Sequence, residues 1–165
     1  MDAVDQLCTN CGLCCDSTLF ADVELRAGDD AKQLAKLGLV LKRKERTKTA
    51  FAQPCACFDG KLCTIYADRP KRCWLFECGV LKKVKAGEMK VSAALKKISG
   101  AKARVKRVGE LLKASGGDER IALSERYARA MSEPVDLASG DAQSHGQLLH
   151  AYEKLMEVLQ RDFLQ

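Results

Sequence analysis

The second half of the chain carries a helical pattern of apolar positions. Apolar residues recur at spacings of three, four and seven between positions 91 and 112, and lysines and arginines lie between them. The apolar positions are Val91, Leu95, Ile98, Val105, Val108 and Leu112. This spacing places them along one side of an α-helix, and Gly116-Gly117 is a typical end for it. Gly100 and Gly109 weaken the predicted helix.

Two further helices are expected after the first. Asp118 can cap a helix that runs to about Met131 and is closed off by Pro134. Ser144 can cap a third helix. Five apolar residues of this third helix share one face: Leu148, Tyr152, Leu155, Leu159 and Phe163. Three amphipathic helices must bury these apolar stripes against one another or against the rest of the chain.

The first half has shorter patterns. Apolar and polar residues alternate in the segment 17–26, which predicts a short strand with one buried side. Asp29 or Asp30 can cap a brief helix that continues through Leu37. Gly38 stands where such a helix is expected to stop.

Residues 39–52 are apolar at both ends and basic between them, which favours two strands around a turn at 44–47. Together these patterns predict a mostly α-helical protein with a small, irregular α+β module that is rich in cysteine. The helices of the second half are expected to pack on this module. We expect a single domain over 1–165, with the cysteine-rich module at 1–80 and the helical part at 81–165.

The composition is typical of a soluble globular protein with few aromatic residues. Of the 165 residues, 47% are hydrophobic, 30% are charged and 5% are aromatic. The N-terminal residues lack the basic start and the apolar run of a signal peptide, and no apolar segment approaches the length of a membrane span. We therefore expect a cytoplasmic protein with no membrane partner, in a compartment where thiols stay reduced.

The net charge of +6 is unevenly placed. Eleven lysines and arginines lie between Leu81 and Lys113, against the two acidic residues Glu88 and Glu110. Such a run can recruit nucleic acid, anionic lipid or an acidic protein partner. It has no interleaved aromatic residues and no nucleic-acid-binding motif, which favours a solvated helix face that offsets the negative charge of thiolates.

All nine cysteines lie in two stretches. Residues 8–15 read Cys-Thr-Asn-Cys-Gly-Leu-Cys-Cys, and the second stretch runs over 55–78. Cysteines at this density are typical of metal binding when nothing indicates secretion. Two cysteines separated by two residues can turn both sulfurs toward one metal about 2.3 Å from each. The side chains of the neighbours Cys14 and Cys15 are expected to diverge. One of the two would therefore bind a second metal, bridge two metals, or lie beside the ligands without binding metal itself.

The second stretch contains a turn signal at Asp59-Gly60. This turn would bring Cys63 back beside Cys55 or Cys57.

Pro70 fits the first turn of a helix that we expect to carry Cys73 and, near its far end, Cys78. Four cations lie beside these cysteines and can offset thiolate charge: Lys61, Arg69, Lys71 and Arg72. The aromatic side chains of Tyr66 and Trp74 are expected to pack around the metal and limit solvent access.

This arrangement of cysteines resembles the YkgJ-type cysteine cluster family, a domain described as zinc- or iron-chelating. The resemblance rests on C-x-x-C-G-x-C-C at 8–15, Pro54-Cys55, Cys63-x-Ile65-Tyr66-x-x-Arg69-Pro70-x-x-Cys73, and Cys78. It implies eight metal ligands: Cys8, Cys11, Cys14, Cys15, Cys55, Cys63, Cys73 and Cys78. The chain departs from the family pattern at Cys57, where relatives carry an apolar or aromatic residue, and at Trp74, where arginine is common.

Eight thiolates can form two zinc sites, one four-iron cluster with four cysteines left over, or a binuclear site with bridging sulfur. Three cysteines at repeated x-x intervals are similar to a ferredoxin run, and the second C-x-x-C knuckle of tandem zinc sites is missing. The family also includes the cysteine region of flagellin lysine methylases, which is associated with an iron-sulfur cluster. The spacing therefore favours an iron-sulfur cluster, of the 4Fe-4S type, over zinc.

Few other groups compete for this role. His145 and His150 are distant in sequence from the cysteines and are expected to have a surface or packing role. The sequence contains no glycine-rich cofactor loop, phosphate-binding loop or H-E-x-x-H motif, so no catalytic residue is indicated.

We predict a protein that chelates iron or zinc through its cysteines. The alternative is a zinc-stabilised module that docks a nucleic acid or a protein partner through the basic helix at 82–113, with no redox role.

Overall fold

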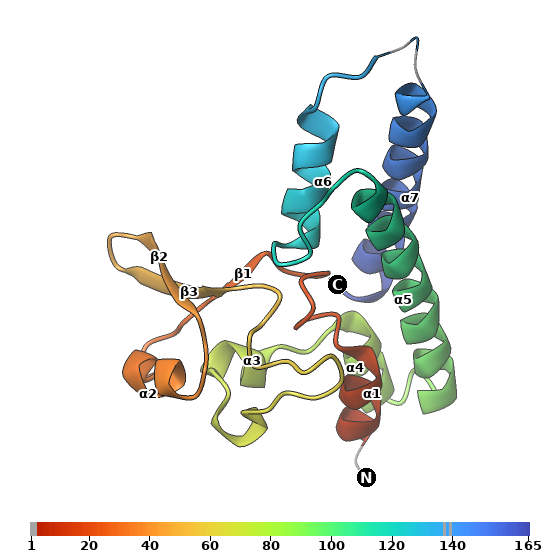
Figure 1. The fold of residues 1–165 in the computed structure, drawn as a ribbon. Helices are drawn as coiled ribbons and strands as arrows, with labels where there is room; N and C mark the ends of the chain where they lie inside the picture. The colour runs from red at the N-terminus through yellow and green to blue at the C-terminus, as the bar shows by residue number, and fades with distance from the viewer. Residues whose placement is uncertain (1–2, 137, 139) are drawn as a thin grey trace.

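In the computed structural model, which describes residues 3–136, 138 and 140–165, a small sheet lies on one side of the molecule and a group of helices on the other (Figure 1). The helices are α1 (Ala3–Cys11), α2 (Ala31–Lys36), α3 (Lys71–Leu75), α4 (Gly79–Lys85), α5 (Val91–Ala114), α6 (Leu123–Ser132) and α7 (Asp141–Asp162), with a 3-10 turn at Tyr66–Asp68. The strands are β1 (Asp22–Glu24), β2 (Leu41–Glu45) and β3 (Lys48–Ala52). The predicted fold class, mostly helical with a small α+β portion, is confirmed.

The sheet is antiparallel with the order β1-β3-β2. Phe51 at its centre pairs with Val23 of β1 on one side and with Leu41 of β2 on the other. The predicted hairpin over 39–52 is therefore confirmed. The first strand is shorter than predicted because the segment before it forms a loop, in which Ser17 has a positive φ of 77°.

A small apolar core lies between the sheet, α2 and the second cysteine stretch. Its buried members are Val23, Leu34, Leu39, Phe51, Cys57 and Ile65. As predicted, Asp30 caps α2, since its Oδ1 accepts a hydrogen bond from the amide of Gln33 at 3.0 Å. Gly38 then stops the helix with a φ of 105°, a conformation that favours glycine.

A larger apolar core lies among the helices, where α5 and α7 run side by side and α1 and α4 pack at one end of α5 (Figure 1). Its buried members are Leu7, Leu13, Val80, Leu81, Ala94, Ile98, Ala101, Val108, Leu112, Leu123, Leu148, Leu155, Val158, Leu159 and Phe163. The predicted stripe of α5 is confirmed, and Gly100 and Gly109 lie within the helix without breaking it. Because Leu7 and Leu13 belong to this core, the first cysteine stretch is anchored among the helices.

Two predicted helix caps are wrong. Helix α6 begins at Leu123, and Asp118 instead accepts hydrogen bonds from the backbone and side chain of Arg120 within a local turn. The first amide of α6, that of Leu123, donates to the hydroxyl oxygen of Ser17 at 3.2 Å. Ser17, which is distant in sequence, therefore accepts a hydrogen bond from an amide that a local capping residue was expected to bind.

The cap at Ser144 is also placed differently. Helix α7 begins at Asp141, so Ser144 lies in the first turn and its hydroxyl donates to the carbonyl of Gly140 at 3.4 Å. The predicted apolar face is present: Leu148, Leu155 and Leu159 are buried.

The structure has two helices, α3 and α4, where a single helix carrying Cys73 and Cys78 was expected. Helix α3 ends at Leu75, because Phe76 adopts an extended conformation with ψ 121°. Cys78 then occupies the N-cap position of α4. Among the described residues, no helix has the length and apolar character needed to cross a membrane.

Candidate metal centre

The first cysteine stretch combines the end of a helix with a tight turn. Cys8 and Cys11 lie three residues apart on α1 and therefore on the same face of that helix. Gly12 ends the helix with a φ of 78°, and the amide of Cys15 donates to the Gly12 carbonyl at 2.8 Å. This turn presents Cys14 and Cys15 directly after the helix.

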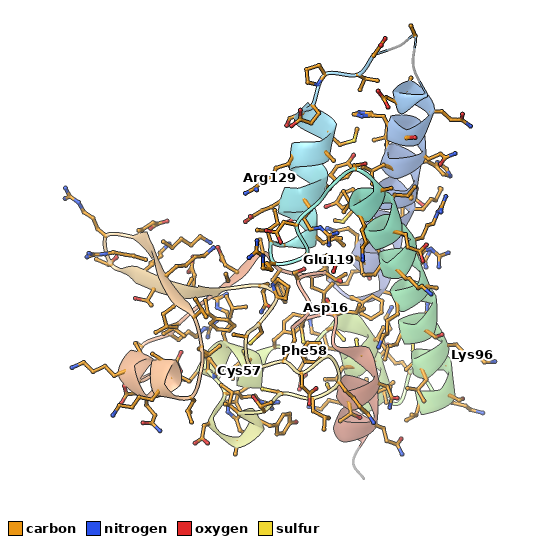
Figure 2. All side chains as sticks on the ribbon, viewed as in Figure 1. Asp16, Cys57, Phe58, Lys96, Glu119 and Arg129 are labelled. Carbon is orange, nitrogen blue, oxygen red and sulfur yellow. The ribbon has the colours of Figure 1, made fainter. Side chains whose placement is uncertain are left out.

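The second cysteine stretch packs against this turn. The amide of Cys55 donates to the carbonyl of Cys15 at 2.8 Å. A Cβ atom placed on Gly12 would lie 2.6 Å from Cζ of Phe58, so the Phe58 ring fills the space that glycine leaves open (Figure 2). Residues 40 or more apart in sequence thus bring the two sets of cysteines together.

The turn predicted at Asp59-Gly60 is confirmed. The Asp59 carboxylate accepts hydrogen bonds from the amides of Lys61 and Leu62 at 2.8 and 2.6 Å. Phe58 and Cys63 form an antiparallel bridge across this turn, so Cys63 lies opposite the residue that follows Cys57.

Cys57 differs from the other eight cysteines. Only 3% of its surface is exposed, and its Sγ donates to the carbonyl of Leu37 at 3.5 Å. In Figure 2 its side chain lies toward α2 and the sheet, whereas Phe58 lies toward α1. A thiol with a carbonyl acceptor keeps its proton, which agrees with leaving Cys57 out of the ligand set.

The remaining cysteines are half-buried thiols, apart from Cys8, which is exposed. Burial raises the pKa of Cys11 and of Cys73 to about 12, and that of Cys55 to about 11. Neighbouring thiols raise these values further, because a second negative charge nearby is unfavourable. At neutral pH these metal-free thiols therefore hold their protons, and a metal ion must displace them.

The thiols of Cys14 and Cys15 form a close pair. Their Sγ atoms lie 3.7 Å apart, and the hydrogen bond between them lowers the pKa of Cys14 and raises that of Cys15. The expectation that these side chains diverge is wrong.

One cation lies against the thiols. The guanidinium of Arg69 sits between two aromatic rings, 3.9 Å from the centroid of Tyr66 and 4.0 Å from that of Trp74. Its Nε is buried and has no hydrogen-bond partner. Its positive charge lowers the pKa of both Cys14 and Cys73, although hydrogen bonding and burial act more strongly on Cys14, and burial and neighbouring thiols act more strongly on Cys73.

The other three cations expected near the thiols have different positions. Lys71 donates from Nζ to the carbonyl of Ala27 and from its amide to Asp29, so it ties α3 to the loop before α2. Arg72 lies 4.0 Å from Glu24 of β1. Lys61 is exposed.

Tyr66 and Trp74 also differ from expectation. They are 41% and 52% exposed, and they hold Arg69 between them. The spacing of three and five residues from the arginine was visible in the sequence, but the stacking depends on the 3-10 turn and on α3, which bring both rings to the same side.

Phe20 and Phe76 are a contact that the sequence did not indicate. Their rings meet edge to face with centroids 5.0 Å apart, and they fasten the loop after the first cysteines to the segment between Cys73 and Cys78.

The donor set suits a soft or borderline metal such as zinc or iron, because thiolate sulfur is the ligand these ions prefer. Within the described ranges, no three His, Cys, Asp or Glu side chains are already placed to hold one ion. A change of cysteine χ1 between staggered positions moves the sulfur by roughly 3 Å while the backbone stays fixed. Side-chain rotation can therefore bring sulfurs closer together without a change in the backbone.

The basic run lies mainly on the outer face of the helical part. Lys96 projects from α5 away from the rest of the molecule (Figure 2). A shallow hollow of about 380 Å³ between α5 and α7 is lined by Arg104, Arg107, Gln147, His150, Ala151 and Lys154. His145 and His150 both lie on α7, outside the cysteine-bearing segments.

Comparison with known proteins gives one match. The family model CxxCxxCC, described as "Putative zinc- or iron-chelating domain", matches residues 7–94, more than half of the chain. This segment contains all nine cysteines and ends within the first turn of α5. No curated protein and no solved structure matches the chain.

Proposed function

Because the chain belongs to the CxxCxxCC family, we propose that it is a metalloprotein that holds iron, as a four-iron iron-sulfur cluster, through thiolates of its two cysteine stretches. The proposed ligands are drawn from eight cysteines: Cys8, Cys11, Cys14, Cys15, Cys55, Cys63, Cys73 and Cys78. The remaining cysteine, Cys57, has a packing role. We also propose a reducing compartment such as the cytoplasm, since these thiols must stay reduced to bind metal.

The observation that carries the proposal is the convergence of thiols from separate elements. Thiols carried by α1, the turn after it, the segment 55–63, α3 and the start of α4 are close enough to raise one another's pKa, which supports a shared site. Grouping so many half-buried thiols is unfavourable once they ionise, as their raised pKa values show. A bound cation removes this penalty, which gives the arrangement a physical reason.

Arg69 supports the same interpretation. Four thiolates around a metal or a cluster leave excess negative charge, and a fixed guanidinium nearby stabilises it. The two aromatic rings hold Arg69 in place and shield it, while its Nε has no other partner. When bound, an iron-sulfur cluster supplies one-electron redox chemistry, whereas zinc supplies a structural cross-link.

Zinc is the alternative occupant of the same cysteines. Eight thiolates match two tetrahedral zinc sites in number. Purification without oxygen separates the two cases. Iron with acid-labile sulfide and broad visible absorption near about 400 nm is expected for the cluster. A colourless protein with stoichiometric zinc would overturn the iron-sulfur proposal and favour zinc.

A second candidate function is docking of an anionic partner on the basic face of α5. The hollow between α5 and α7 favours it, since Arg104, Arg107 and Lys154 lie around one opening. Exchanging Arg104 and Arg107 for glutamine should then weaken binding of nucleic acid or of an acidic protein at low salt. Unchanged binding would exclude this candidate, and exchange of Lys96 on the outer face serves as a control.

A further inference from the structure

The eight cysteines divide into two groups when each is assigned to the core against which it packs. Cys11 and Cys78 pack against the larger core among the helices. Cys55, Cys63 and Cys73 pack against the smaller core beside the sheet. The two cores are built from different residues, so these five thiols lie in two separate packing environments.

Backbone placement extends this division to the other three cysteines. Cys8 lies on α1 one turn before Cys11, and α1 packs against α4, whose N-cap is Cys78. Cys14 follows directly after α1. Cys15 carries the carbonyl that binds the amide of Cys55, so it is joined to the sheet side.

Cys14 and Cys15 bring the two groups into contact, because their Sγ atoms lie 3.7 Å apart.

We propose that the chain holds two metal centres that meet at the Cys14–Cys15 pair, each with four thiolates. The helix-side centre uses Cys8, Cys11, Cys14 and Cys78. The sheet-side centre uses Cys15, Cys55, Cys63 and Cys73. The inference rests on the proposed function, because it assumes that the cysteines bind metal. It adds a second centre to the single cluster proposed above and does not depend on whether the native metal is iron or zinc.

Zinc alone, added to the reduced metal-free protein, is the probe, and native mass spectrometry counts the bound ions. The helix-side variant replaces Cys11 and Cys78 by serine, and the sheet-side variant replaces Cys63 and Cys73 by serine. The cross variant replaces Cys11 and Cys63. We expect two zinc ions in the wild type, one in each same-side variant, and no site of wild-type affinity in the cross variant when a competing chelator is present.

A second measurement identifies the protected thiols in the same samples. Alkylation of the zinc-loaded helix-side variant, followed by mapping of the modified residues, should leave one set unmodified: Cys15, Cys55, Cys63 and Cys73. The sheet-side variant should protect the complementary set: Cys8, Cys11, Cys14 and Cys78. Protein with Cys57→Ser should still bind two ions. Far-UV circular dichroism shows whether each variant keeps its helices.

The outcomes separate the two proposals. If the wild type binds zinc but the same-side and cross variants lose it equally, the division into two centres is overturned while metal binding stands. If both same-side variants lose all zinc with their helices intact, one shared centre replaces two. If the folded wild type binds no zinc and no iron, the proposed function itself fails.

Discussion

Raising the pH should destabilise the metal-free protein through two half-buried thiols, Cys11 and Cys73. Burial raises the pKa of Cys11 and of Cys73 to about 12 from the ordinary 9.0. At pH 8 the folded and unfolded chains both hold these protons, so neither thiol affects stability. Above pH 9 the unfolded chain releases them while the folded chain keeps them, so the free energy of unfolding falls as pH rises.

The magnitude follows from the two pKa values. Each pH unit above 9 costs about 1.4 kcal/mol per thiol until the folded pKa is reached. At pH 10 the two thiols together should lower the free energy of unfolding by about 3 kcal/mol. Domains have stabilities of about 5–15 kcal/mol, so this loss is easily measured.

Urea unfolding of reduced, chelator-treated protein at pH 8, 9 and 10, followed by far-UV circular dichroism, tests this prediction. The matched control replaces Cys11 and Cys73 by serine, which does not titrate in this range, and retains every lysine and tyrosine that does. The wild type should lose about 3 kcal/mol more than the control between pH 8 and 10. Equal losses in the two proteins would show that these two thiols do not keep their protons longer in the folded chain than in the unfolded one. Metal-loaded wild type should escape the loss, since its thiols are already deprotonated.

Three further predictions concern single side chains. Arg69→Gln should weaken zinc binding, measured by chelator competition, by about 5–30-fold because it removes about 1–2 kcal/mol of charge stabilisation, whereas Arg69→Lys should keep part of it; equal affinities in all three proteins would remove Arg69 from the site. Gly79→Ala should destabilise the fold by about 1–3 kcal/mol because its Cβ would lie 2.7 Å from the Asp162 carbonyl oxygen, whereas Gly109→Ala, with open space around it, should stabilise α5 by about 0.5–1 kcal/mol in thermal unfolding. Asp162→Asn should cost about 1–3 kcal/mol at pH 7 and flatten the loss of stability below pH 4, since Arg161 and Lys97 hold the pKa of Asp162 below its ordinary value; an unchanged acid unfolding curve would contradict this.

The parts of the fold that were predictable depend on local pattern. Helix α5 follows from apolar spacing sustained over its whole length, and the turn at Asp59-Gly60 follows from side-chain to backbone hydrogen bonds within three residues. Asp30 likewise caps α2 through its nearest amides. In each case the deciding contacts lie within one or two turns of chain.

The predictions were wrong where a contact with a residue distant in sequence determines the local structure. The hydroxyl of Ser17, not a local cap, satisfies the first amide of α6, so Asp118 is left to a turn of its own. The break between α3 and α4 accompanies the edge-to-face packing of Phe76 on Phe20. No local pattern contains these contacts.

The candidate site shows the same contrast. Cysteine spacing indicated the type of ligand, and the resemblance to the cysteine cluster family set Cys57 apart, which agrees with the hydrogen bond from its thiol to Leu37. The grouping of the other cysteines depends on which of two cores each packs against, a property of the folded chain alone. The closeness of Cys14 and Cys15 depends on the turn that Gly12 allows.

Metal binding by the cysteines can be tested through the content of iron, zinc and acid-labile sulfide per folded chain in protein purified without oxygen, measured before and after exhaustive chelation. We expect stoichiometric metal that chelation removes and that is diminished when Cys11 and Cys63 are replaced by serine. A folded protein that contains neither iron nor zinc, and whose unfolding is unaffected by chelators, would contradict this expectation.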